Sequence, residues 1–172
     1  METIAVYWEP IIKTYGFLEK TGLSLFRISL AFDQITGWGA RIQEIGAIGG
    51  GFLMATGRMV DAETLQLHLL FEKNTADRYR VELEKLAEAD PRTTLSVEVP
   101  VELICFHGPH FGDRYGIADA AFGTLAREKL AVLAAACTGA SIYIVVPEKN
   151  ARTAVKLLSK HFSAPQPEEN QV

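Results

Sequence analysis

An internal repeat limits the folds open to this 172-residue chain more than any other feature of its sequence. Hydrophobic periodicity predicts the order strand, helix, strand, strand, helix, strand between Leu23 and Val99. The same order recurs from Val101 to Phe162, except that the last strand is missing. Two copies of one unit fit this length, which allows a substantial hydrophobic core.

The second copy has the clearest pattern. Its first helix, opening at Gly116, places apolar residues at helical spacing, and its second runs from Ala151 to Phe162. Between them a strand ends at Cys137, Thr138-Gly139 predicts a hairpin turn, and the next strand alternates from Ser141 to Val146. The order is that of a ferredoxin-like unit without its closing strand.

The N-terminus offers the missing strand. Residues 164–172 are polar and proline-rich, which predicts a disordered tail rather than a core strand. The segment Ile11–Phe17 is β-branched and aromatic and has no place in the first copy. We therefore expect it to complete the second copy, with Glu19–Gly22 forming a polar turn before the next strand.

The predicted fold class is α+β, with two ferredoxin-like βαββαβ repeats whose antiparallel sheets carry helices on one face. The first domain is expected over 22–99. The second is expected over 100–163, completed by a strand at 10–18. Pro100 has no N–H to donate to a ladder, so it is expected to divide the run 95–103 into two strands.

Charge and composition exclude several classes of function. A net charge of −4 and a pI near 5.6 argue against nucleic-acid or membrane partners. No run approaches the ~18–20 apolar residues of a membrane span, and the N-terminus has no signal-peptide pattern. Cys105 and Cys137 lie in apolar strand patterns, which predicts buried thiols and indicates a cytoplasmic location.

Short motifs in both repeats carry a resemblance to a known family. The segment from Asp33 to Ile42 is similar to the family's Asp-x-Pro-Gly-Val-Ala-Ala-Arg-Ile, although its proline is absent and its loop is one residue longer. Gly116-Ile117-Ala118 resembles a Gly-Val-Ala helix opening, and Ala154-Val155 with Leu158 and Phe162 resembles the family's closing helix. With the strand count, these motifs make the chain resemble the paired ACT domains that form the regulatory half of aspartate kinases.

The resemblance implies regulation without catalysis. The chain has no room for a kinase domain and no nucleotide motif, and no nucleophile–base pair, carboxylate pair or cofactor fingerprint is evident. The expectation is therefore a stand-alone tandem ACT protein that is not an enzyme and has no cofactor. It binds a small ligand, an amino acid by the resemblance, and signals through a homodimer or a partner, such as a biosynthetic enzyme regulated in trans.

The turn between the first strand and first helix of each repeat is the expected ligand site. Unpaired N–H groups at a helix N-terminus suit the carboxylate of an amino acid, and a nearby carboxylate suits its ammonium. The plainer interpretation is that Asp33 caps its helix, Gln34 is solvated and Trp38 is core or a dimer contact. The expected ligand-binding residues are Asp33, Gln34, Ile35, Gly37 and Trp38 in the first repeat, and Asp113, Arg114, Tyr115 and Gly116 in the second.

Two alternatives remain open. The first is an interaction or structural ACT protein that dimerises without binding a ligand. The second is a metal-dependent protein, because His107, His110 and Asp113 are spaced three residues apart in one loop. Three ligands on one loop make a weak metal signal, so no metal site is predicted. The effector, the pathway and the oligomeric state are beyond the sequence.

Overall fold

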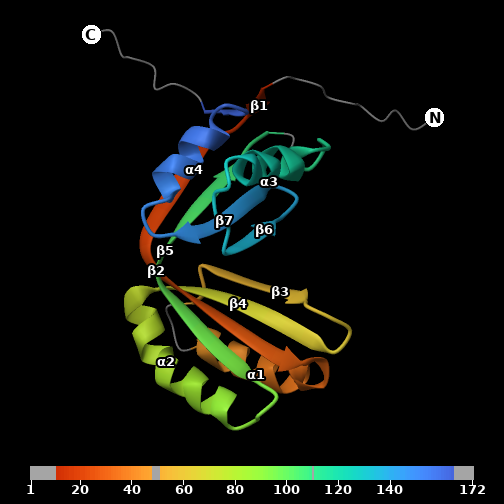
Figure 1. The fold of residues 1–172 in the computed structure, drawn as a ribbon, viewed down its shortest axis with the longest axis vertical. Coiled ribbons are helices and arrows are strands. Elements are labelled where there is room, and N and C mark those ends of the chain that lie inside the picture. Colours follow the sequence, from red (N-terminus) through yellow and green to blue (C-terminus); the bar gives the residue numbers. More distant parts are fainter. Residues whose placement is uncertain (1–10, 48–50, 110, 165–172) are drawn as a thin grey trace, which may run out of the picture. The chain divides into compact units, whose positions relative to one another are not determined.

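The computed structural model describes residues 11–47, 51–109 and 111–164, and they form two compact units (Figure 1). Thr21–Val101 form unit 2, whereas the described residues up to Lys20 join those from Glu102 onward in unit 1. The boundary falls inside two long strands, β2 (Gly16–Ala31) and β5 (Thr94–His107), so each strand contributes residues to both units. None of the described helices is long and apolar enough to span a membrane.

Unit 2 is a four-stranded sheet with two helices on one face (Figure 1). Its strand order is β3-β4-β2-β5, with β3 at Met54–Met59 and β4 at Thr64–Glu72. The helices are α1 (Ile35–Ala47), preceded by the 3-10 turn η1 (Phe32–Gln34), and α2 (Lys73–Glu88). This is the ferredoxin-like order predicted for the first repeat.

Alternation along the strands builds the unit 2 core. In the antiparallel pairing of β2 with β4, Phe26 lies opposite Leu69 and Ile28 opposite Leu67. These residues face α2, which turns Ala76, Tyr79 and Leu83 inward at helical spacing, and α1, which adds Trp38 and Ile45. Phe71 contacts Phe26 edge-to-face at a centroid distance of 5.4 Å.

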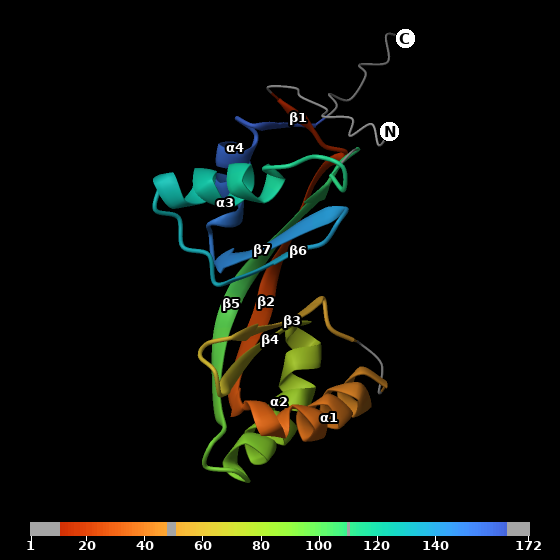
Figure 2. The same ribbon diagram turned by 90° about the vertical axis from the view of Figure 1, so that its right-hand side faces the viewer.

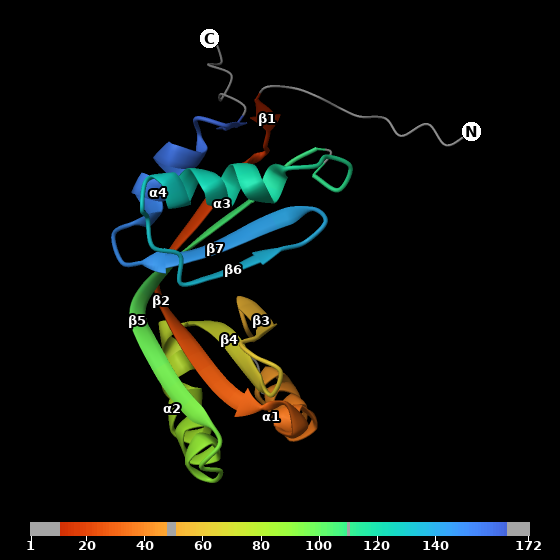
Figure 3. The same cartoon turned by 45° about the vertical axis from the view of Figure 1, so that its right-hand side comes forward.

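Unit 1 has the corresponding order β2-β5-β7-β6, with the first part of β2 in the place of the closing strand. Its other elements are α3 (Ile117–Arg127), β6 (Ala134–Cys137), β7 (Ser141–Pro147), α4 (Ala151–Leu158) and β8 (Phe162–Ser163). Figure 2 and Figure 3 show α3 running beside the β6–β7 hairpin. Ile142, Ile144 and Val146 point from β7 into a core shared with both helices.

The N-terminal chain closes unit 1, which confirms the predicted exchange of a strand. Strand β1 (Ile12–Lys13) pairs in parallel with β8. The N–H of Ile12 donates to the carbonyl of His161 at 2.8 Å, and that of Thr14 to Ser163 at 2.8 Å. Phe162 is fully buried beneath this pair, 4.9 Å from the ring of Phe106. The segment that fills the fourth place in the sheet begins at Gly16, later than the predicted Ile11–Phe17.

Several element boundaries differ from the prediction. Glu19–Gly22 are not a turn but exposed positions of β2, where polar side chains suit solvent and Gly22 takes a φ of +68°. Pro100 does not divide β5, because it is exposed and its missing donor costs at most one ladder bond. Cys137 is exposed rather than buried. Of the predicted tail at 164–172, residues 165–172 lie outside the described residues.

A polar band covers part of the sheet of unit 2 on the face opposite its core. Arg27 donates to Glu98 at 2.7 Å, and Gln66 Nε2 donates to Ser29 Oγ at 3.2 Å. His68 is buried beside them, and its burial, with the charges of Arg27 and Arg58, lowers its pKa. His68 is therefore held neutral in the folded protein.

Gly108 is expected to tolerate no side chain, because the N-terminal chain passes against it. A Cβ there would meet the Lys13 carbonyl and would lie 2.7 Å from the Phe111 ring and 3.1 Å from Thr14 Cα. We predict that Gly108→Ala lowers the free energy of unfolding by about 1–3 kcal/mol in urea denaturation. Gly139→Ala, where a Cβ meets nothing within 4 Å, is the control and should change stability little. Equal effects would mean that β1 does not pass here.

The buried imidazole of His68 predicts a loss of stability in mild acid. Its folded pKa lies below the unfolded value of about 6.5, so the unfolded chain binds a proton first. The free energy of unfolding that neutral His68 contributes is fully present above pH 6.5. It is lost as the pH falls from 6.5 toward the pKa of His68 in the folded protein. Urea denaturation at pH 7.5 and 5.5 should show this loss, and His68→Gln should reduce it. His107→Gln, at an exposed position, should leave it unchanged.

Candidate functional site

The predicted turn of the first repeat is built differently from the sequence expectation. Asp33 does not cap helix α1; it lies in η1 with its side chain in solvent. The cap comes from Gln34, whose Oε1 accepts the N–H of Ala31 at 2.8 Å. On the other side, the N–H of Phe32 donates to the Glu63 carbonyl at 2.7 Å. These bonds attach the turn to the end of β2 and to the β3–β4 loop.

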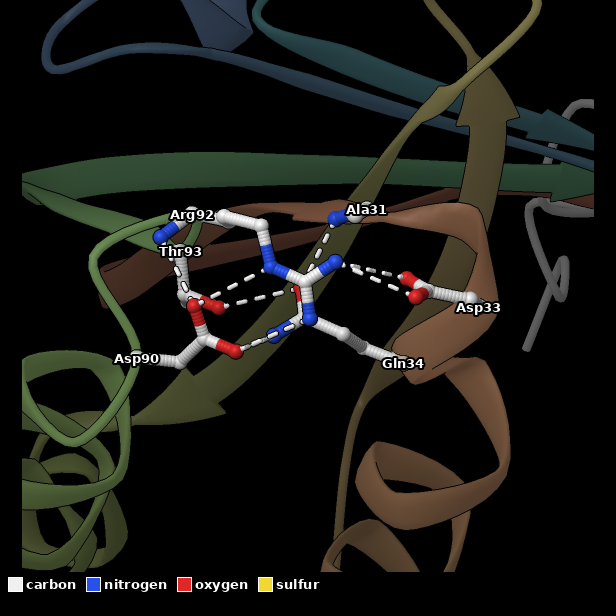
Figure 4. Close-up of polar contacts among 6 residues, drawn as sticks. All are labelled: Ala31, Asp33, Gln34, Asp90, Arg92 and Thr93. Carbon is white, nitrogen blue, oxygen red and sulfur yellow. Dashed lines mark hydrogen bonds and ion pairs between the residues drawn. The ribbon is translucent and has the colours of Figure 1, made fainter.

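A polar network joins this turn to the loop between α2 and β5 (Figure 4). Arg92 donates to both carboxylate oxygens of Asp33, at 3.1 and 3.3 Å, and to Asp90 at 3.2 Å. The amide Nε2 of Gln34 also donates to Asp90, and Thr93 Oγ1 donates to Gln34 Oε1 at 3.4 Å. Two segments far apart in the chain are thus bound together by five polar side chains.

The network holds Asp90 and Arg92 in their ionised forms. Hydrogen bonds from Arg92 lower the pKa of Asp90, and the bond from its backbone N–H has a larger effect than the bond from its side chain. Hydrogen bonds to Asp90 and, with a smaller effect, to Asp33 raise the pKa of Arg92. Because the Asp33–Arg92 pair is largely exposed, it positions the loop more than it stabilises the fold.

The remaining predicted residues of the first repeat lie in different environments. Trp38 is only 7% exposed and belongs to the core of unit 2, so its ring offers no open surface at the turn. Ile35 and Gly37 are exposed on the first turn of α1. The sequence prediction missed Asp90, Arg92 and Thr93. The only signal for them was Asp90-Pro91, which marked a helix end.

The equivalent loop of unit 1 precedes helix α3. Gly116 takes a φ of +84° and its carbonyl accepts the N–H of Ala120 at 2.9 Å, so the glycine sets the chain direction into the helix. Tyr115 is 86% exposed, Asp113 is exposed and Arg114 is half-buried. The two predicted sets of site residues therefore belong to different units.

The histidine loop gives no metal centre within the described residues. His107 is exposed, and its ring lies 5.2 Å from that of Tyr15. His110 lies outside the described part of the chain. Elsewhere in that part, no three His, Cys, Asp or Glu side chains form a group that could hold a metal ion.

Comparison with known proteins identifies the class of the second repeat. The family model of the ACT domain matches residues 99–160, which confirms the resemblance inferred from the sequence. No curated protein matches the chain.

Solved structures of aspartate kinase regulatory regions share the fold of nearly the whole chain. The regulatory subunit from Thermus thermophilus, in its ligand-free form, has a TM-score of 0.74 at 14% identity, with 87% of this chain and 99% of that one covered. The kinases from Clostridium acetobutylicum and Synechocystis have TM-scores of 0.72 and 0.75 at 17% and 15% identity. Each matches 92% of this chain, which spans 37% and 29% of their respective lengths. At these identities the likeness shows the fold alone.

The cap geometry predicts that Gln34 contributes more to stability than Asp33. Gln34→Ala leaves the N–H of Ala31 without its acceptor and removes one hydrogen bond to Asp90, which should cost about 1 kcal/mol. Asp33→Ala removes only an exposed ion pair and should cost less than about 0.5 kcal/mol. Urea denaturation of both variants measures the difference. The opposite ranking would show that Asp33 is the cap after all.

Proposed function

We propose that this chain is a regulatory protein with two ACT units that binds an amino acid and passes the signal to a partner. The proposal is supported by the ACT match at 99–160 and by the fold, which is that of aspartate kinase regulatory subunits. The role proposed is sensing rather than catalysis.

The turn at Asp33 and Gln34 is the observation that favours ligand sensing in unit 2. Five polar side chains there are bonded across two separate segments, and the Asp33–Arg92 pair among them is exposed, so exchange of its partners is inexpensive. A zwitterion brings one carboxylate and one ammonium, which compete for the same donors and acceptors. We propose that Ile35, Gly37 and Trp38 help to shape this region, and that Asp113, Arg114, Tyr115 and Gly116 form its counterpart in unit 1.

The proposed signal is a shift between two assemblies of the protein. A ligand changes an equilibrium only by its difference in affinity for the two states. The assemblies we propose are a homodimer and, in trans, a complex with a biosynthetic enzyme. A sheet with helices on one face leaves strand edges available for such contacts.

A second function is favoured by one feature of the same turn. Arg92 already pairs with Asp33, and Gln34 with Asp90, as they would in an ACT protein that has lost its ligand and acts only through protein contacts. Such a protein dimerises but does not respond to amino acids.

Binding of an amino acid predicts a rise in thermal stability. Thermal-shift assays with each of the twenty L-amino acids, followed by calorimetry on any that respond, test this. A ligand at about 100-fold above its Kd should stabilise the protein by about 2.7 kcal/mol. The D-enantiomer of the responding amino acid is the control and should have little effect. If none stabilises the protein at millimolar concentration, the sensing function is wrong and the interaction-only function is favoured.

A further inference from the structure

A groove of about 320 Å³ lies between helix α2 and strand β5, entirely within unit 2. Its volume exceeds that of an aliphatic amino acid, and no residue predicted from the sequence lines it. The groove has an apolar floor and charged groups along one wall. Its lining residues are Arg80, Glu84, Ala87, Glu88, Thr93, Leu95 and Val97.

Arg80 offers unused hydrogen-bond donors to the groove. Its Nε donates to Glu84 at 2.9 Å, one turn along the helix. Its two terminal amino groups bond to no other residue in the described part of the chain. A guanidinium with both terminal groups available binds a carboxylate through two parallel bonds.

Glu88 offers an unpaired negative charge at the other end of the same wall. It has neither a hydrogen bond nor an ion pair with any described residue. Glu84 stands four residues before it, so the two carboxylates repel each other on one helix face. An ammonium group between them relieves that repulsion and gains charge-assisted hydrogen bonds.

The spacing of these groups suits a molecule with adjacent opposite charges. The bond to Glu84 places the guanidinium of Arg80 beside a carboxylate whose residue stands four positions, about one helical turn, before Glu88. A carboxylate and an ammonium on the same carbon suit this arrangement, the first facing Arg80 and the second facing Glu88.

The floor of the groove selects the rest of the ligand. Leu95 and Val97 alternate with outward-facing residues of β5, and Ala87 on α2 is small enough to leave space above them. Together these three side chains offer apolar contact to a short alkyl chain.

We infer that the groove between α2 and β5 binds an α-amino acid with an aliphatic side chain, its carboxylate on Arg80 and its ammonium on Glu88. This assignment rests on the proposed sensing function and moves the ligand contacts from the turn to the neighbouring groove. Thr93 lines the groove and donates to Gln34 on the turn, so an occupied groove acts directly on the network of Asp33, Asp90 and Arg92.

Calorimetry with the full chain tests the assignment, using L-valine, L-leucine and L-isoleucine as ligands. Isobutylamine and isovalerate, which are valine without its carboxylate or its ammonium, should each bind at least about tenfold more weakly. Arg80→Gln and Glu88→Gln should weaken binding of the amino acid by a similar factor. Arg78→Gln and Glu82→Gln, on α2 but outside this groove, are matched controls and should bind normally. Circular dichroism of each variant verifies that it is folded.

Each alternative result has a distinct meaning. If Arg80→Gln and Glu88→Gln bind normally while Asp33→Ala and Gln34→Ala do not, the ligand lies at the turn: the groove assignment is wrong and the sensing function stands. Isovalerate binding as tightly as valine overturns the contact with Glu88. If none of the twenty amino acids binds, both the assignment and the sensing function are wrong.

Discussion

The closing of the second repeat by the segment that leads into β2 is the constraint on which the architecture depends. The first part of β2 fills the position that the last strand of a ferredoxin-like unit normally occupies, where it covers the edge of the sheet. The backbone bonds of Ile12 and Thr14 to the segment 161–163 attach the residues just before β2 to the C-terminal end of the described chain. The first repeat is in effect an insertion between that strand and the rest of its sheet.

Much of this arrangement was predictable because hydrophobic periodicity follows directly from burial. The alternation in β7 and the helical spacing in α2 identify the buried faces, and counting strands reveals the exchange. The errors occur where local signals compete with the sheet. Glu19–Gly22 look like a turn because they are polar, yet polar residues are equally suited to an exposed stretch of strand. Pro100 suggests a break in the strand, but β5 continues through it, because proline removes only one backbone hydrogen-bond donor from the ladder.

The site was less predictable, because its parts are far apart in the sequence. The turn at Asp33 could be located from the pattern strand-then-helix, but the role of capping residue passed to Gln34, and only tertiary contact brings Arg92 to Asp33. Trp38 could not be assigned to core or surface until the helix was placed on its sheet. The groove beside the turn has no sequence signature, since Arg80 and Glu88 resemble any solvated helix face. The proposed sensing site depends on residue pairs that no periodicity encodes.

The nested arrangement of the two units also bears on how the chain acquires its structure during synthesis. Unit 2 is continuous in sequence and leaves the ribosome complete, whereas unit 1 waits for Phe162 and Ser163, among the last described residues to be made. Strands β2 and β5 are neighbours, so once unit 2 has folded it holds Lys20 close to Glu102. The loop that the β1–β8 pairing has to close is then shorter, and part of its closure entropy has already been met. The inserted repeat thus acts as a template for the one that surrounds it.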